Sequence, residues 1–249
     1  MGITYADPDV NVDALRRFKD DVTTAHGKGL RSLTTSRGIT YIHGRAKLQT
    51  GSRAVIVDGE YANQEIAFKS AILATGSQAM PLPGVSFDSD VVMNAEEALR
   101  LESVPERLLV VGAGYIGLEL SSIYRALGSK VTIAEMLSGL MPGADRDIVK
   151  VFEKENGDLF EEILVETKVT SVEEGDGSAL VTTESADGES TTLEFDKVLV
   201  TIGREARTEG LGISGLGIET DEKGFVVVDE QRRTTVDSIF AVGDLSGAP

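Results

Sequence analysis

Three glycines at fixed spacing constrain the fold of this chain more than any other feature. Gly112, Gly114 and Gly117 come directly after the apolar run Leu108–Val111, and a helical pattern follows over residues 116–127. Glycines at these positions let the chain turn tightly out of a strand, bring its backbone close to a pyrophosphate and pack the helix against the strand. The helix N-terminus then offers free N–H groups and a favourable dipole to an anion. The pattern therefore predicts a Rossmann-like α/β domain that binds a dinucleotide.

A carboxylate at the end of the next predicted strand indicates which dinucleotide binds. Glu135 closes the apolar run that begins at Val131, about 20 residues after the glycine turn, which is the spacing of the ribose-binding acid in this fold. Its carboxylate can accept hydrogen bonds from ribose hydroxyls and would repel the 2′-phosphate of NADP. No basic residue follows before Arg146. We therefore expect NAD rather than NADP. The alternative is a glycine-rich turn of some other α/β fold, which this combination of strand, helix and acid disfavours.

The two halves of the chain repeat one pattern. In each half, short antiparallel strands lead to a buried strand, predicted at Ser70–Leu73 and at Lys197–Thr201, which ends in Ala-Thr-Gly or Thr-Ile-Gly. Only the second copy is preceded by a strand, a glycine turn and a helix. If the first copy is also a dinucleotide-binding domain, its own glycine turn must precede Met1. We therefore expect the sequence to be truncated at its N-terminus.

Hydrophobic periodicity and turn residues predict the remaining elements. An opening helix carries Leu15, Phe18, Val22 and Ala25 on one face, with Asn11 available as its N-cap. Further strands are expected at Ile39–Ile42, Ala54–Val57, Gln64–Phe68, 164–172, 178–183 and 191–195, with an acidic helix over 145–155.

Composition excludes several classes of protein. The sequence has no cysteine and only two histidines, so it offers no disulfide, no cysteine nucleophile and no metal site of the usual thiolate or histidine kind. The formal net charge of −17 disfavours nucleic-acid binding, which needs a basic surface. The acidic residues are spread along the chain, which fits either an ordinary acidic surface or a halophilic protein. No apolar run suggests a membrane span and no secretory signal is visible, so we expect a cytoplasmic protein.

Five short motifs carry further information. They are Ala74-Thr-Gly-Ser77, Val110-Val-Gly-Ala-Gly-Tyr-Ile-Gly-Leu-Glu119, Val131-Thr-Ile-Ala-Glu135, Val200-Thr-Ile-Gly-Arg204 and Ala241-Val-Gly-Asp244. Together they resemble the successive signatures of the flavoprotein disulfide reductases, and the resemblance covers essentially the whole chain. Their spacing and the linker Pro81-Leu-Pro-Gly84 are most similar to the dihydrolipoyl dehydrogenases of that family. As a set, the motifs are specific to flavoproteins with two dinucleotide-binding domains and less specific to one member.

The resemblance implies roles for single residues on the NAD side. Glu135 resembles the ribose-binding acid, Val169 the residue beside the NAD adenine, and Gly203 the glycine whose backbone meets the nicotinamide side. In the family, the glutamate that matches Glu119 lies near the nicotinamide and flavin rings; a solvated or capping charge is the alternative interpretation. The segment that resembles the NAD pyrophosphate site consists of Gly112, Ala113, Gly114, Tyr115, Ile116, Gly117, Leu118 and Glu119.

On the FAD side the resemblance covers only part of a site. Asp244 resembles the acid that holds the flavin ribityl chain, with an ordinary turn as the alternative, and Arg204 is assigned no role. Ala46 resembles the backbone contact to the FAD adenine, and Thr75, Gly76 and Ser77 resemble the segment that passes the FAD pyrophosphate. Compared with the family, this sequence lacks the first FAD turn, the redox-active cysteine pair and the C-terminal domain with a His–Glu pair. The resemblance therefore implies no catalytic residue in this chain.

These observations predict an α/β fold with two dinucleotide-binding parts. A Rossmann-like NAD-binding domain with a β-meander crossover, residues 85–205, is expected to be inserted in an incomplete FAD-binding domain of the same type, residues 1–84 and 206–249. The resemblance implies that the full-length enzyme oxidises dihydrolipoyl groups with FAD and NAD, as a homodimer and a component of 2-oxoacid dehydrogenase complexes. We expect this chain alone to be inactive. The alternatives are another flavoprotein disulfide reductase, an NADH oxidase or a non-catalytic NAD-binding module.

Overall fold

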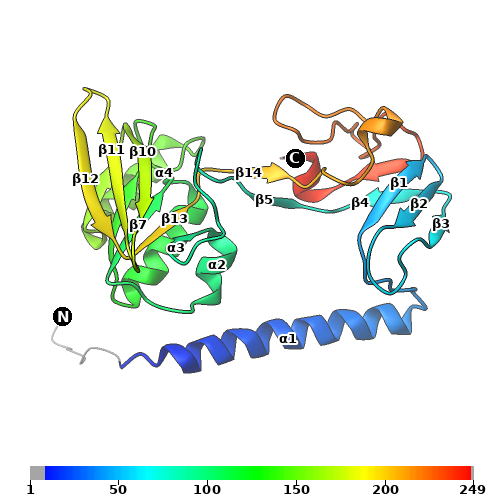
Figure 1. The fold of residues 1–249 in the computed structure, drawn as a ribbon, viewed down its shortest axis with the longest axis horizontal. Coiled ribbons are helices and arrows are strands. Elements are labelled where there is room, and N and C mark those ends of the chain that lie inside the picture. Colours follow the sequence, from blue (N-terminus) through cyan, green and yellow to red (C-terminus); the bar gives the residue numbers. More distant parts are fainter. Residues whose placement is uncertain (1–8, 248–249) are drawn as a thin grey trace. The chain divides into compact units, whose positions relative to one another are not determined.

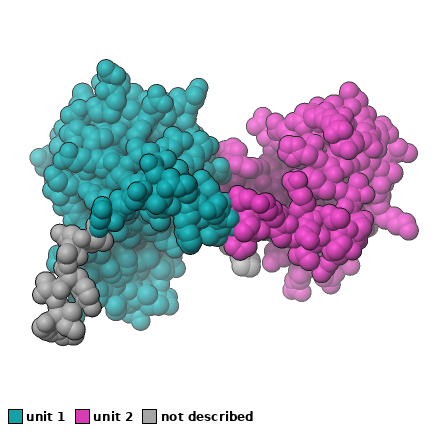
Figure 2. All heavy atoms as spheres, turned by 90° about the horizontal axis from the view of Figure 1, so that it is seen from below, with its two compact units in different colours: residues 1–23, 79–203 teal, residues 24–78, 204–249 magenta. Residues whose placement is uncertain are grey.

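The computed structural model describes residues 9–247 and divides into two compact units. Unit 1, teal in Figure 2, contains the chain up to Thr23 together with Ala79–Gly203, and unit 2, magenta, contains Thr24–Gln78 and the chain from Arg204 onward. The division falls within helix α1 (Val12–Ser36), whose start is capped by the side chain of Asn11 as expected. No helix in the described part of the chain has the length and apolar character needed to cross a membrane.

Unit 1 is built on a parallel sheet. Its strands run in the order β6 (Val92–Met93), β13 (Lys197–Val200), β7 (Arg107–Val111), β8 (Lys130–Ala134) and β9 (Glu162–Leu164). Figure 1 labels the two central strands, β13 and β7. The register sets Val111 beside both Val200 and Ala134. The glycine turn, Thr201 and Glu135, which follow these three strands, therefore meet at one carboxyl edge of the sheet. That edge is where ligands bind in open α/β sheets.

Helices cover one face of this sheet and a three-stranded meander covers the other. Leu108 and Val110 of β7 lie in a core cluster with side chains of the helices, whereas Leu109 and Val111 lie in a cluster with the meander. Burial on both faces explains why the parallel strands read as nearly continuous apolar runs. The covering elements are α2 (Ala95–Arg100), α3 (Tyr115–Ala126), α4 (Arg146–Asn156), the 3-10 turn Gly157–Leu159, and the strands β10 (Thr167–Glu174), β11 (Ala179–Ser185) and β12 (Ser190–Phe195).

Apart from the second part of helix α1, unit 2 consists of short strands and turns. Leu73 of β4 and Ile239 of β15 are buried in its core, whereas Ile72 is 68% exposed. Its antiparallel sheet contains β1 (Ala46–Thr50), β2 (Arg53–Ile56) and β3 (Glu65–Ala67); β4 (Ala71–Leu73) pairs in parallel with β15 (Ile239–Ala241); β5 (Ser77–Ala79) pairs with β14 (Arg204–Ala206); and two 3-10 turns span Ser214–Leu216 and Gly243–Ser246.

The mixed α/β fold with a parallel sheet is confirmed, and three local predictions were wrong. Ile39–Ile42 forms no strand; Ile39 is exposed there, and no neighbouring strand in the described residues pairs with it. The run 164–172 is divided between two strands, because β9 ends at Leu164 and β10 begins at Thr167. The strand at β4 is only partly buried.

Helix α2 was not predicted, although its start carries a recognisable signal. The side chain of Asn94 accepts N–H groups of the first helical turn, and the carboxylate of Glu97 accepts the N–H of Asn94 at 2.8 Å. This reciprocal pattern is a capping box, and it follows from an Asn and a Glu three residues apart. The helix is only six residues long, too short for a periodic apolar pattern to mark it.

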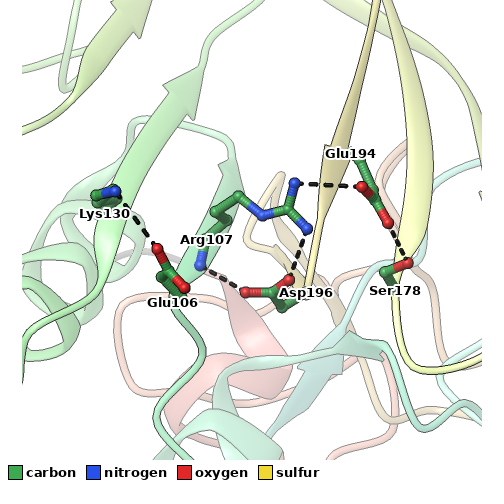
Figure 3. A network of polar contacts seen from close by, with 6 residues as sticks. All are labelled: Glu106, Arg107, Lys130, Ser178, Glu194 and Asp196. Atoms are coloured by element: carbon green, nitrogen blue, oxygen red, sulfur yellow. Dashed lines mark hydrogen bonds and ion pairs between the residues drawn. The ribbon is translucent and has the colours of Figure 1, made fainter.

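A polar network joins the start of β7 to the end of β12 (Figure 3). The guanidinium of Arg107 binds the carboxylate of Asp196 at 2.9 Å and that of Glu194 at 3.3 Å. The backbone N–H of Arg107 also donates to Asp196 at 2.7 Å, and the hydroxyl of Ser178 donates to Glu194 at 2.7 Å. Burial raises the pKa of Asp196, but the hydrogen bonds from Arg107 and its charge outweigh burial, so the pKa is lowered overall.

The lowered pKa predicts an acid-sensitive contribution to stability. A carboxylate whose folded pKa lies below its unfolded value stabilises the fold above the unfolded pKa, about 4, and loses that contribution as pH falls through the folded pKa. Asp196→Asn keeps an acceptor for the Arg107 N–H but cannot titrate. In denaturation curves between pH 6 and pH 2.5, we expect the stability of the wild-type chain to fall more steeply below pH 4 than that of the variant. If the free energy of unfolding of both proteins depended on pH in the same way, Asp196 would make no acid-sensitive contribution to stability.

Candidate dinucleotide-binding site

The structure gives each of the three glycines in the turn a different surrounding. A Cβ on Gly112, whose φ is +101°, would lie 2.6 Å from the carbonyl oxygen of Thr201, and one on Gly117 would lie 2.1 Å from the carbonyl oxygen of Gly112. Both positions are closed by the protein itself. A Cβ on Gly114 would meet nothing within 4 Å. The middle glycine therefore leaves open space beside the backbone, where a pyrophosphate can approach.

Helix α3 begins directly after this open position. Gly114 is its N-cap residue and provides no side-chain cap, and the first backbone bond into the helix runs from the N–H of Leu118 to the carbonyl of Gly114. The N–H groups of the first helical turn have no intrahelical acceptor, because a helix leaves its first donors free. Together with the helix dipole, they form the kind of site that holds phosphate groups.

Glu135 lies beside the turn with its carboxylate held by two backbone donors. The residue is 7% exposed. Its Oε2 accepts the N–H of Ala113 at 2.7 Å, and its Oε1 accepts the N–H of Leu137 at 2.8 Å. A carboxylate has about four lone-pair positions, so this side chain retains the capacity to accept two ribose hydroxyls while remaining fixed in orientation.

The first basic residue after Glu135 is bound to carbonyl groups of its own loop. The guanidinium of Arg146 donates to the carbonyls of Leu140 and Met141, each at 2.8 Å, and to that of Ala144 at 3.2 Å. The N–H of Met141 in turn donates to the carbonyl of Ala113. Arg146 therefore ties the loop together, and the N–H of Met141 connects the loop to the glycine turn. Three donors of Arg146 bind carbonyls, which leaves few for a phosphate.

The other residues expected on the NAD side all lie in unit 1. Val169 is half-buried on β10, and Gly203 follows β13, with its carbonyl accepting the N–H of Met80 at 3.1 Å. On α3, Leu118 is buried in the core, whereas the side chains of Tyr115 and Glu119 are exposed. Ile116 is partly buried and packs against the core cluster.

The residues expected on the FAD side gather in unit 2, with an arginine that the sequence analysis left without a role. The hydroxyl of Ser77 donates to the carboxylate of Asp244 at 2.5 Å. Arg204 donates to the same hydroxyl at 2.7 Å and to the carbonyl of Ser77 at 3.0 Å. Thr75 donates to the carbonyl of Arg207, and Gly76 adopts a φ of +70° with open space where its Cβ would stand.

Ala46 lies apart from this cluster along the chain, at the start of β1. It pairs with Ile56 across the antiparallel sheet, and its side chain is exposed. Unit 2 thus presents a carboxylate that can accept hydroxyl groups of a flavin nucleotide and a guanidinium that can donate to its phosphates. It also presents a glycine with open space beside its backbone. Among the described residues of unit 2, no strand, glycine turn and helix follow one another as they do in unit 1.

Comparison with known proteins gives the family. The chain matches pyridine nucleotide-disulphide oxidoreductase over residues 6–249. It is 39% identical to dihydrolipoyl dehydrogenase 2 of Haloarcula marismortui and 38% identical to dihydrolipoyl dehydrogenase of Vibrio cholerae. Both alignments cover 100% of this chain, and they cover 53% of the Haloarcula protein and 52% of the Vibrio protein. The solved structure of the HOCl-induced flavoprotein disulfide reductase RclA from Escherichia coli is similar with a TM-score of 0.82 and 29% identity, over 96% of this chain and 53% of that one.

The chain therefore spans about half the length of the curated relatives it matches. The family match nevertheless covers residues 6–249 of this chain, and the solved relative has a similar fold. The chain belongs to the pyridine nucleotide-disulphide oxidoreductase family of oxidoreductases.

Proposed function

We propose that unit 1 binds NAD, with the pyrophosphate at the glycine turn and the adenosine ribose on Glu135. The observation that carries this proposal is the open space at Gly114 beside the uncapped start of α3, next to a buried carboxylate that two N–H groups hold in place. NAD, when bound, supplies the hydride acceptor. The residues of this chain bind and orient it: α3 faces the phosphates, Glu135 selects ribose hydroxyls, and Val169 and Gly203 border its two ends.

We propose further that the whole protein is a dihydrolipoyl dehydrogenase that also uses FAD. Its likeness to relatives of that name supports this, as does the cluster of Ser77, Arg204 and Asp244, which fits the hydroxyl and phosphate groups of a flavin nucleotide. Homodimer formation, membership of 2-oxoacid dehydrogenase complexes and a cytoplasmic location belong to the same proposal. The charge of −17 and the Haloarcula marismortui relative support a halophilic origin.

The second candidate is another flavoprotein disulfide reductase. The likeness to the solved flavoprotein disulfide reductase RclA favours it. A non-catalytic NAD-binding module is the third candidate, since every residue of the proposed NAD site lies within unit 1. The proposed NAD site of unit 1 is compatible with all three candidates, and NAD binding is therefore the property to test first.

The test is nucleotide selectivity in the wild-type chain and in Glu135→Ala. We expect calorimetric titration to show NAD binding more tightly than NADP. The variant should bind NAD about 10-fold more weakly, because it loses the ribose hydrogen bonds. Its affinity for NADP should not fall in the same way, because the negative charge that repels the 2′-phosphate is removed.

The matched control is Glu162→Ala, which removes an exposed carboxylate from the adjoining strand β9. This variant should bind both nucleotides as the wild type does. Equal or tighter binding of NADP by the wild-type chain would reject the proposed selectivity. Absence of saturable NAD binding would reject the proposed function of unit 1.

A further inference from the structure

One peptide group in the glycine turn is bound by side chains at both of its polar ends. The hydroxyl of Thr201 donates to the carbonyl oxygens of Gly112, at 2.9 Å, and of Val111, at 3.0 Å, as one shared hydrogen bond. The N–H of Ala113 donates to Glu135 at 2.7 Å. The Gly112 carbonyl and the Ala113 N–H belong to the same trans peptide, which is planar and points them in opposite directions. Thr201 and Glu135 therefore bind opposite edges of the Gly112–Ala113 peptide and together fix its orientation.

Thr201 is itself fixed in place at the end of β13. Its N–H donates to the carbonyl of Val111 at 2.8 Å. The two closed glycines of the turn pack against it: a Cβ on Gly112 would lie 2.6 Å from its carbonyl oxygen, and one on Gly117 would lie 2.7 Å from its hydroxyl oxygen. The turn thus closes around Thr201, and the hydroxyl has little freedom to leave the Gly112 carbonyl.

We propose that Thr201 is a positioning residue for the ribose-binding carboxylate. Its hydroxyl sets the orientation of the Gly112–Ala113 peptide, and the N–H of that peptide sets the orientation of Glu135. Without the hydroxyl, the peptide can rotate, the Ala113 N–H leaves the carboxylate, and Glu135 loses one of its two backbone donors. This inference rests on the proposed function, because the carboxylate matters for binding only if unit 1 takes NAD.

The test compares three substitutions of threonine. Thr201→Val removes the hydroxyl at nearly constant shape, and Thr201→Ser retains it. Thr183→Val removes a hydroxyl that donates to a carbonyl within the meander, at 3.4 Å from the backbone of Thr191. We expect Thr201→Val to raise the dissociation constant of NAD by about 5- to 10-fold, the loss of one buried hydrogen bond. Thr201→Ser should stay within about 2-fold of the wild type, as should Thr183→Val.

Two readouts separate positioning from a general structural effect. In a Glu135→Ala background, Thr201→Val should weaken NAD binding by less than about 2-fold, because the carboxylate through which it acts is absent. Without any ligand, the amide proton of Ala113 should lie far downfield in the NMR spectrum of the wild type. It should move upfield in Thr201→Val but not in Thr201→Ser or Thr183→Val. It should also exchange faster with solvent in Thr201→Val.

Failure of the positioning role of Thr201 and failure of NAD binding by unit 1 give different results. If the wild-type chain binds no NAD, the proposed function fails, and the Ala113 amide still reports whether Thr201 orients the peptide. If the wild type binds NAD and Thr201→Val binds it equally well, the positioning role is wrong. An equal loss with and without Glu135 would also overturn it, since the effect would then not pass through the carboxylate.

Discussion

Gly117→Ala is expected to destabilise unit 1 severely, although it places a better helix former inside a helix. A Cβ at this position would stand 2.1 Å from the carbonyl oxygen of Gly112 and 2.7 Å from the hydroxyl oxygen of Thr201. Neither can retreat, because Thr201 is bonded to β7 and the carbonyl of Gly112 accepts its hydroxyl. In an open helix, Gly→Ala stabilises by about 1 kcal/mol. Here we expect a loss of at least about 3 kcal/mol in the free energy of unfolding.

Gly114→Ala is the matched control for this prediction. Its Cβ would meet nothing within 4 Å, and the residue has an extended backbone with φ −71° and ψ 178° that alanine readily adopts. We expect chemical denaturation to show a loss of no more than about 1 kcal/mol, the usual cost of alanine at an N-cap. Its NAD affinity should nevertheless fall, because the methyl group enters the space proposed for the pyrophosphate. Similar free energies of unfolding for the two alanine variants would contradict the close packing at Gly117 and the open space at Gly114.

The 249-residue chain should show no dihydrolipoyl dehydrogenase activity on its own. Thiol–disulfide exchange requires a thiolate as the attacking group, and the sequence contains no cysteine. With dihydrolipoamide, NAD and added FAD, the rate of NADH formation should equal the rate without protein. A full-length enzyme of this kind turns over on the order of 1 to 1,000 times per second, so the expected difference is very large.

The positive control is the Haloarcula marismortui dihydrolipoyl dehydrogenase 2, which aligns with the whole of this chain. Both proteins should be assayed in low and molar salt, since we expect salt to screen the repulsion that a net charge of −17 produces. Turnover that scales with the concentration of this chain and persists after repeated purification would overturn the prediction. It would require sulfur chemistry without a protein thiol.

The sequence was sufficient to predict the elements around the glycine turn of unit 1. The strand before Gly112, the turn, helix α3 and Glu135 at the end of β8 all follow from residue spacing and apolar periodicity, which are properties of neighbouring residues. The register of β7 with β8 and β13 then brings their ends together. For this reason the glycine turn and Glu135 could be proposed as one candidate site from the sequence, whereas Val169 and Gly203 were proposed from the family resemblance.

The contributions of Thr201 and Arg204 could not be predicted in this way. The hydroxyl of Thr201 binds Gly112 from 89 residues away, and Arg204 binds Ser77 from 127 residues away. Each lies in the motif Val200-Thr-Ile-Gly-Arg204, which marks a strand end but says nothing about which distant carbonyl or hydroxyl its side chains contact. Such contacts depend on strand order and on the packing of the turn, and these become visible only in the folded chain.

The measurement that tests the central claim most directly is a titration of the isotope-labelled chain with NAD, followed by amide NMR. We expect saturable shifts at residues 112–119 of the turn and the start of α3, and at Glu135 and Leu137. Residues of unit 2 should shift little, and the same titration with NADP should require a higher concentration. Shifts confined to unit 2, or none at saturating NAD, would contradict the assignment of the glycine turn and Glu135 as the NAD site.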